Sequence, residues 1–310
     1  MNWIKKTLNF GEKIKKLLKV RPTKEDIENS DWTSCCKGPI LKTQLEENLW
    51  VCHDCGKHHR ISAKQRLDIT FGTGNYEIIK TPIPVDDPLE WVDAKSYKDR
   101  LKSARKKTGL DCAVLIAKAK LNEIEITVGA FDFNFIGGSV GQAEGEALIC
   151  GVQNAIDNNQ PFLLFTASGG MRMFESLIAL SQMSRVTLAV NELKKKNLPY
   201  IVILTDPTAG GTTASFGMTG DITFAEPGAL VAFAGKRVIQ GTVKEELPSD
   251  FQTSEYVEEK CGFIDLVVER KNLSEKISSI LSILLKKNSD IISELNETSE
   301  DTRTLTKAAS

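Results

Sequence analysis

The chain lacks the residue patterns of several common enzyme classes. All three histidines lie at or before His59, so the long remainder of the 310 residues offers no partner for a Ser-His-Asp triad. Ser168 follows Ala167, where a nucleophile elbow has glycine. No Gly-x-x-x-x-Gly-Lys-Ser/Thr loop is present, which argues against ATP hydrolysis through a P-loop. Chemistry on this chain must therefore rely on backbone hydrogen-bond donors.

The chain also has almost no net charge and lacks long apolar runs. Lys plus Arg number 40 against 41 Asp plus Glu, a formal net charge of -1, so no chain-wide basic field favours nucleic acid as the main partner. No segment approaches the roughly 20 apolar residues of a transmembrane helix, and none resembles a signal-peptide core. We therefore expect a globular cytoplasmic protein without a membrane partner.

Composition divides the chain into four parts. We predict a basic N-terminal arm over residues 1–30, a Cys/His-rich module over 31–60, a long body over 61–290 and a polar, disordered tail over 291–310. The arm is partly amphipathic, and contact with a membrane surface or RNA is the alternative to a solvated segment.

The Cys/His-rich module is typical of a metal site. It holds four of the seven cysteines, and Cys52-His53-Asp54-Cys55 has the Cys-x-x-Cys spacing at which two thiolates meet one tetrahedral ion. The other pair, Cys35-Cys36, lacks the two spacer residues, and adjacent side chains cannot easily reach the same metal. Disulfides are less expected in a reducing cytosol.

Three interpretations of this module stay open. Zinc is held by Cys35, Cys36, Cys52 and Cys55 with some distortion, or by one residue of the first pair with Cys52, Cys55 and His58 or His59, or the module has lost its metal. Outside the module, apolar neighbours favour small buried side chains for the remaining cysteines, Cys112, Cys150 and Cys261.

The body shows alternating strand and helix patterns, which predict an α/β class. Stretches 113–116 and 125–135 lead through a glycine turn into a helix ending near Ile156, a β-β-α unit. Later units are shorter: strand 161–165 with helix 172–196, strand 200–204 with a helix from about 211, and strands 222–225 and 230–234. Asn272 and Glu275 predict the cap of a terminal helix with an apolar stripe of Ile277, Ile280, Leu281, Leu284 and Leu285.

Three glycine pairs are the candidate functional motifs of the body. Gly137-Gly138, Gly169-Gly170 and Gly210-Gly211 each follow a strand pattern and precede a helical one. A single pair indicates little, because glycines commonly serve tight turns and close packing. A helix that begins on glycines exposes unpaired backbone N–H groups without a side chain in the way. Such a turn can bind a developing oxyanion, which indicates an enzyme acting on an acyl group.

Around these pairs the chain resembles the carboxyltransferase beta subunit of bacterial acetyl-CoA carboxylase, over about residues 31–288. Trp32 and Glu46-Glu47-Asn48-Leu49 are similar to that family's zinc ribbon. The motifs that carry the resemblance are Phe133-Asn134-Phe135-Ile136-Gly137-Gly138-Ser139-Val140-Gly141, Ser168-Gly169-Gly170-Met171-Arg172-Met173, Leu204-Thr205-Asp206-Pro207-Thr208-Ala209-Gly210-Gly211, Ala225-Glu226-Pro227 and Phe233-Ala234-Gly235-Lys236-Arg237-Val238-Ile239. The family usually has Ala at position 171 and Pro at position 236, and neither difference removes an N–H group needed here.

The resemblance implies a ClpP/crotonase-like superhelix of β-β-α units with a small zinc-ribbon-like module. It implies transfer of a carboxyl group from carboxybiotin to acetyl-CoA, giving malonyl-CoA for fatty acid synthesis. By resemblance, Gly210 and Gly211 supply oxyanion donors. Gly137, Gly138, Gly169 and Gly170 shape the CoA channel, and Arg172 and Arg237 contact CoA phosphates or a partner, with a surface salt bridge as the alternative for each arginine.

The resemblance also implies other subunits. These are a carboxyltransferase alpha subunit in an α2β2 heterotetramer, a biotin carboxyl carrier protein that supplies biotin, and an ATP-using biotin carboxylase. Other functions stay open at this level: carboxyl transfer or decarboxylation with another acyl-CoA such as propionyl-CoA, or nucleic-acid regulation through the ribbon and arm. A crotonase-type hydratase is disfavoured, because Glu144, Glu146 and Glu175 show no acid/base pairing in the sequence.

Overall fold

A computed structural model describes residues 31–35, 38–243 and 246–285, without the side chains of Arg237 and Val243. The chain divides into two compact units, residues 1–57 and 58–310, each described by itself below. The predicted basic arm (1–30) and disordered tail (291–310) lie outside the described residues and stay predictions.

The first unit is a small hairpin followed by a helix. Strands β1 (Trp32–Cys35) and β2 (Gly38–Leu41) pair antiparallel, and α3 (Lys42–Glu47) follows at once. Its buried apolar residues are Ile40, Leu45 and Cys52, against which Cys35, Trp50 and Cys55 pack. A core this small gives little stability alone, so a bound metal would contribute directly to folding.

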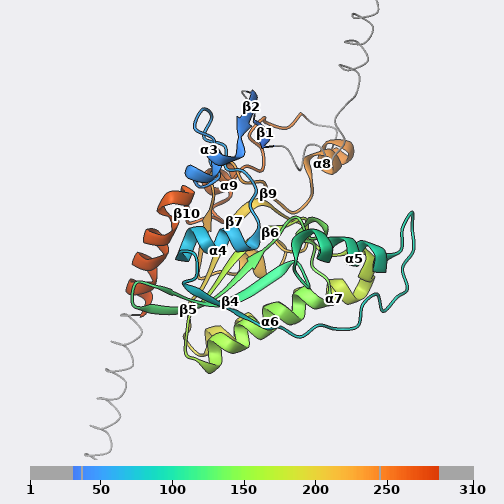
Figure 1. Cartoon of the computed structure of the whole chain (residues 1–310), viewed down its shortest axis with the longest axis horizontal. Helices are drawn as coiled ribbons and strands as arrows, with labels where there is room; N and C mark the ends of the chain where they lie inside the picture. Colours follow the sequence, from blue (N-terminus) through green and yellow to red (C-terminus); the bar gives the residue numbers. More distant parts are fainter. Residues whose placement is uncertain (1–30, 36–37, 244–245, 286–310) are drawn as a thin grey trace, which may run out of the picture. The chain divides into compact units, whose positions relative to one another are not determined.

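The second unit is built on a mixed sheet of eight strands within its described residues (Figure 1). Strands β5 to β8 and β10 run parallel, β9 adds a parallel pair to β7, and β3 and β4 are antiparallel to their neighbours. In spatial order the strands are β10 (Leu266–Val267), β8 (Ile222–Ala225), β7 (Tyr200–Ala209), β6 (Phe162–Ser168), β5 (Ile124–Phe131), β4 (Val114–Leu121) and β3 (Tyr76–Ile79), with β9 (Val231–Ala232) beside β7.

Both faces of the central strands are buried. Along β6, Phe162 and Leu164 join one apolar cluster, whereas Leu163 and Phe165 join the other. Helices α6 (Gln142–Asp157) and α7 (Ser176–Lys195) cover the first face, and α4 (Ala63–Phe71) and helix 273–285 cover the second (Figure 1). Strands buried on both faces are continuous apolar runs in sequence, which is how β6 and β7 were predicted.

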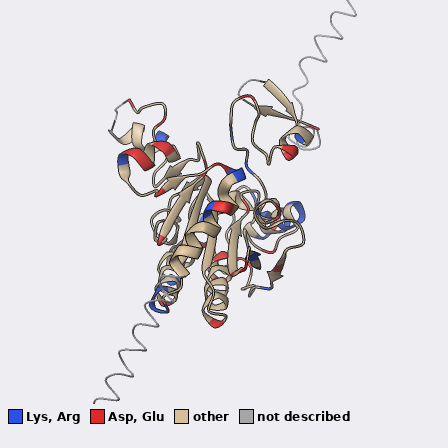
Figure 2. Cartoon of the chain, turned by 90° about the vertical axis from the view of Figure 1, so that its left-hand side faces the viewer, with Lys and Arg blue, Asp and Glu red and all other residues tan. Residues whose placement is uncertain are grey.

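Charged residues lie mostly on helices and loops, and β6 and β7 carry only Asp206 (Figure 2). Short elements join the layers: α5 (Tyr97–Thr108), α8 (Lys236–Val243), α9 (Ser254–Cys261), and the 3-10 turns η1 (Ile136–Gly138), η2 (Met173–Glu175), η3 (Phe216–Met218) and η4 (Arg270–Asn272). Ser96 and Thr253 cap α5 and α9 by accepting N–H bonds, and left-handed Gly109 and Gly262 end them.

Two local predictions are wrong. No helix begins at Gly211, because residues 210–215 form turns before η3. The hydroxyls of Thr213 and Ser215 donate to the carbonyls of Gly210 (2.8 Å) and Gly211 (2.6 Å), local bonds that compete with a helix. Asn272 is not a cap, because η4 runs directly into helix 273–285, although the predicted stripe is buried at Ile277 and Leu281.

In the part of the chain that the structure describes, no helix combines the length and apolar character needed to cross a bilayer.

Candidate active site

Glycine turns from three parts of the sequence meet beyond the carboxyl ends of β5, β6 and β7. The Gly169 N–H donates to the Gly137 carbonyl oxygen at 2.9 Å, and the Val140 N–H donates to the Gly170 carbonyl oxygen at 2.9 Å. A Cβ built on Gly170 would lie 3.3 Å from the nitrogen of Gly211, so the second and third turns are also in contact. The fold therefore brings the three predicted pairs together at the strand ends, where open α/β sheets usually bind ligands.

Backbone geometry explains the glycines at this site. Gly138, Gly170 and Gly210 have φ values of 61°, 108° and 62°, in the region that favours glycine. A side chain at Gly138 would also overlap the carbonyl oxygen of Ala167. The Gly169-Gly170 and Gly210-Gly211 turns can be in contact only because neither glycine pair carries side chains.

Most glycine amides at the site are already used within the protein. Gly138 N–H donates to Phe135 O at 2.9 Å, and Gly170 N–H donates to the Ser168 hydroxyl at 3.1 Å. The amide of Gly210 donates to the carbonyls of Ala232 (3.0 Å) and Phe233 (3.1 Å), so it is not free in this structure, and its role as an oxyanion donor stays a prediction. Within the described residues, the Gly211 amide has no acceptor and stays a candidate donor.

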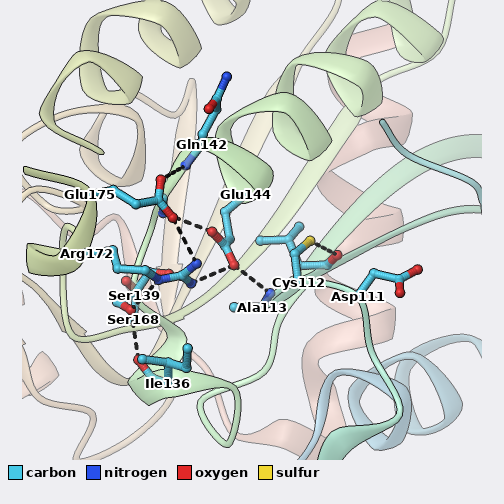
Figure 3. A network of polar contacts seen from close by, with 12 residues as sticks. Asp111, Cys112, Ala113, Ile136, Ser139, Gln142, Glu144, Ser168, Arg172 and Glu175 are labelled. Atoms are coloured by element: carbon cyan, nitrogen blue, oxygen red, sulfur yellow. Dashed lines mark hydrogen bonds and ion pairs between the residues drawn. The ribbon is translucent and has the colours of Figure 1, made fainter. Parts of the chain in front are cut away.

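A buried ionic network lies directly behind the first two turns (Figure 3). The Arg172 side chain, 1% exposed, donates through Nη2 to Glu144 Oε1 at 2.6 Å and through Nε to the Ser139 hydroxyl at 3.1 Å. Its Nη1 donates to the Tyr97 hydroxyl at 3.0 Å and lies 3.5 Å from Glu175 Oε1. These contacts tie the turn after β6 to the turn after β5 and to α5.

The two carboxylates of this network also bind backbone amides. Glu144 accepts from the N–H groups of Ala113 (2.8 Å) and Gly141 (2.9 Å), and Glu175 accepts from the Gln142 N–H (2.6 Å) (Figure 3). The last two amides belong to the first turn of α6, where the helix dipole favours negative charge. This balances a network that contains two carboxylates but one guanidinium.

The prediction that Arg172 contacts CoA phosphates or a partner is therefore wrong. Its guanidinium is buried, and its hydrogen bonds go to neighbouring protein groups. Burial would lower the pKa of Arg172, but Glu144 and the other charged partners outweigh it and raise the pKa. Arg237 lies in α8, and its side chain is outside the described residues, so its role stays a prediction.

The same contacts bear on the hydratase alternative. Glu144 and Glu175 are bound to Arg172 and to backbone amides, and Glu146 lies 2.8 Å from Arg185. None of the three is placed as a free acid/base group facing the glycine turns. The structure thus supports the sequence argument against carboxylate-driven hydration.

A second buried ion cluster fixes the end of β8. Arg66 and Arg270 both donate to the Glu226 carboxylate, with Nη to Oε distances of 2.5 Å and 2.7 Å, and His58 Nδ1 lies 3.7 Å from it. Burial alone would raise the pKa of Glu226, but Arg66, the hydrogen bonds from Arg270 and the nearby His58 ring hold the pKa well below the usual range. The cluster joins α4, η4 and the start of the second unit to the Ala225-Glu226-Pro227 motif.

Three cysteines of the first unit form a possible metal site. The sulfur atoms of Cys35, Cys52 and Cys55 all lie within 4.8 Å of one another, a separation that suits thiolates around one tetrahedral zinc ion. Cys36 lies outside the described residues and stays a predicted ligand. His58 belongs to the second unit, where it faces Glu226.

The remaining cysteines differ from one another. Cys112 is buried beside the Arg172 network, and burial raises the pKa of its thiol to about 12, so it is inert as predicted. Cys150 is half-buried. Cys261 is exposed at the end of α9, so its predicted burial is wrong.

Sequence comparison identifies the family. A family model described as the carboxyl transferase domain matches residues 92–307. The acetyl-coenzyme A carboxylase carboxyl transferase subunit beta of Pelagibacter ubique strain HTCC1062 is 70% identical over 310 residues, covering 100% of both chains. The chain belongs to this carboxyl transferase beta-subunit family. The family member of Caulobacter vibrioides strain NA1000 is 47% identical over 84% of this chain and 85% of its own.

Solved structures confirm the predicted crotonase-like α/β fold of this beta-subunit family member. A transcarboxylase 12S structure with methylmalonyl-coenzyme A bound superposes with a TM-score of 0.58 at 21% identity, covering 72% of this chain and 41% of that one. A Pseudomonas malonate decarboxylase hetero-dimer gives a TM-score of 0.55 at 17% identity, covering 76% and 95%. At these identities the likeness concerns the fold alone.

The sequence analysis missed the polar groups that support the glycine turns. Tyr97 and Glu144 carry no motif of their own, Ser139 stands in the Phe133–Gly141 motif without an assigned role, and Tyr97 lies 75 residues from Arg172 in sequence. One signal was available, because Gly141 followed by Glu144 is a capping arrangement at the start of α6. Nothing in the pattern showed that Arg172 would reach it.

Proposed function

We propose that this chain transfers the carboxyl group from carboxybiotin to acetyl-CoA, forming malonyl-CoA for fatty acid synthesis. The observation that carries the proposal is the meeting of three glycine turns at the Gly211 amide, for which the described residues provide no internal acceptor. Membership of the beta-subunit family supports the substrate class. We place this activity in the cytoplasm, as the sequence analysis expects.

The chemistry needs a stabilised enolate rather than a side-chain nucleophile. Loss of a proton from the acetyl methyl group places negative charge on the thioester oxygen. The Gly211 N–H is proposed to donate to that oxygen, fixed in place by the contacts of Gly170 and the bonded amide of Gly210. Gly137, Gly138 and Gly169 are proposed to border the CoA channel, which their lack of side chains keeps open. Carboxybiotin would supply the carboxyl group. Its ureido nitrogen, freed of that group, would be the base that takes the methyl proton.

The site is proposed to be completed by other proteins. Because the chain belongs to a beta-subunit family, we expect it to have partner subunits. We assign these as a carboxyltransferase alpha subunit in an α2β2 assembly, a biotin carboxyl carrier protein and a biotin carboxylase that uses the ATP.

The reverse reaction tests the proposed function. The chain, purified with an alpha-type partner, is supplied with malonyl-CoA and biocytin, and acetyl-CoA is measured by chromatography. We expect acetyl-CoA to form only when both substrates and both subunits are present. Production that is unchanged without biocytin would mean simple decarboxylation and would contradict the proposal. Methylmalonyl-CoA in a parallel assay tests the propionyl-CoA alternative.

We further propose that Cys35, Cys52 and Cys55 hold a structural zinc ion, with Cys36 as the candidate fourth ligand. Protein purified without chelator is expected to contain about one zinc per chain by mass spectrometry, since structural sites close with four ligands. Cys52→Ser should release most of the metal and lower the unfolding temperature, whereas Cys261→Ser, an exposed cysteine elsewhere, should change neither. Wild-type protein without zinc would exclude this assignment.

A further inference from the structure

One arginine contacts the segments that lead into the first and the third glycine turns. The Arg60 Nε atom donates to Asp206 Oδ2 at 2.9 Å, and the Arg60 guanidinium carbon lies 4.2 Å from the centre of the Phe133 ring. Asp206 stands in the motif that ends at Gly211, and Phe133 opens the motif that contains Gly137. All of these residues belong to the second unit of the chain. The guanidinium therefore bridges two parts of the candidate active site.

The Phe133 side of this bridge reaches the first glycine turn. A Cβ built on Gly137 would lie 4.0 Å from two atoms of the Phe133 ring, which is ordinary van der Waals contact. A cavity of about 10 Å³, room for one water molecule, has Arg60, Phe133 and Ala167 among its lining residues. Removal of the guanidinium would enlarge this space and give the ring freedom to move away from the turn.

The Asp206 side of the bridge reaches the third glycine turn through hydrogen bonds. Asp206 Oδ1 accepts the Leu230 N–H at 3.2 Å, and the Leu230 carbonyl oxygen accepts the Thr208 N–H at 2.8 Å. The Gly210 amide then donates to carbonyls of the segment that follows Leu230. Asp206 is thus the first member of a row of bonds that fixes the backbone leading to the Gly211 amide.

The backbone on both sides of Arg60 is anchored. The His59 carbonyl oxygen accepts from Arg270 Nη2 at 3.0 Å, and the Ala63 N–H donates to Asp132 Oδ2 at 3.1 Å. The Arg60 side chain is 47% exposed, and exposed ion pairs usually contribute little to stability. Position is a separate matter, because a flat guanidinium that stacks on a ring while it donates to a carboxylate has one preferred orientation.

We propose that Arg60 is a positioning residue for carboxyl transfer. Its guanidinium sets the spacing between the first and the third glycine turns, and so aims the Gly211 amide at the thioester oxygen. Arg60 acts through Phe133 and Asp206. The inference rests on the proposed function, since transfer is the reaction that a displaced amide slows. A shift of about 1 Å in such a group costs about 10²-fold in rate, so partial loosening is measurable.

Substitutions at position 60 separate the shape of the guanidinium from its charge. Arg60→Met keeps an unbranched chain without the guanidinium, whereas Arg60→Lys keeps the charge without the flat stacking group. The complex with the alpha-type partner is assayed for acetyl-CoA formed from malonyl-CoA and biocytin. We expect Arg60→Met to lower kcat about tenfold, a fraction of the loss from a 1 Å displacement. Arg60→Lys should fall between Arg60→Met and wild type, and KM for malonyl-CoA should stay within about twofold.

The partner residue and a matched arginine complete the kinetic test. Asp206→Asn weakens the charge-assisted bond and keeps an oxygen for the Leu230 N–H. The double variant of Arg60→Met with Asp206→Asn should be about as slow as Arg60→Met alone, because both side chains form one link. Arg185→Met is the control: the Arg185 side chain is 41% exposed and pairs with Glu146, and its loss should leave kcat at the wild-type value.

Backbone hydrogen exchange of the same complexes measures the displacement without turnover. We expect Arg60→Met to speed exchange in residues 133–141 and 205–214 and to leave α6 unchanged. An unchanged kcat would overturn the inference. So would a rise confined to KM for malonyl-CoA, which would mean that Arg60 contacts CoA itself, or faster exchange along the whole chain with a lower unfolding temperature. Wild-type complex that transfers no carboxyl group, while the exchange difference persists, would count against the proposed function alone.

Discussion

Arg172→Met is expected to destabilise the chain by about 3–5 kcal/mol, because it leaves two buried carboxylates without their cation. Glu144 is 0% exposed and Glu175 is 4% exposed, so water cannot replace the guanidinium without opening the structure. Urea unfolding of the isolated chain, followed by circular dichroism, measures the change. Transfer activity of the complex should fall as well, because the network holds the first glycine turn against the second.

A matched substitution on the same side of the fold gives the control. Arg185 lies in α7 and pairs with Glu146 at 2.8 Å, but its side chain is 41% exposed. Arg185→Met should therefore cost about 0–1 kcal/mol, the usual value for a solvated pair. Equal changes in the free energy of unfolding for the two substitutions would show that the Arg172 network stabilises the chain no more than a solvated ion pair does.

Some features of this fold could be predicted from the sequence because neighbouring residues show them. Strands β6 and β7 could be predicted because burial on both faces leaves long apolar runs. The glycine pairs could be found because positive φ and close backbone contact exclude other residues. The apolar runs and the glycine pairs are both local signals, because the residues that form each feature are also the residues that reveal it.

Partners distant in sequence carry no such signal. Arg172 follows a glycine turn and could equally face a phosphate or a carboxylate, and the choice is set by Glu144 on another element. The Gly210 amide was predicted to be free, yet its acceptors lie 22 and 23 residues later, at Ala232 and Phe233. The Gln252 Oε1 atom, which accepts no hydrogen bond from the described residues, is likewise a feature of the folded chain that no sequence motif shows.

Gly211→Val is expected to lower the transfer rate about 10²–10³-fold, comparable to loss of an oxyanion donor. A Cβ at this position would overlap the Met171 side chain and lie 3.1 Å from Met183 Sδ, so the branched side chain must push the turn away from its neighbours. A shift of about 1 Å in a positioning group is enough to cost about 10²-fold. Stability should change little, because the flexible thioether chains take up part of the overlap while the turn takes up the rest, and Gly211 does not have the positive φ that penalises other residues. The rate is measured as acetyl-CoA formed from malonyl-CoA and biocytin.

Met171→Ala separates a displaced turn from a damaged fold. Alanine at position 171 removes the two nearest atoms that a Cβ at position 211 would meet, both from the Met171 side chain. The single Met171→Ala variant should be close to wild type in transfer rate. Combined with Gly211→Val, it should restore part of the lost rate, because the turn can then return and aim its amide at the thioester oxygen. Wild-type turnover by Gly211→Val alone would mean that this amide is not the donor, and the enolate would need another source of stabilisation.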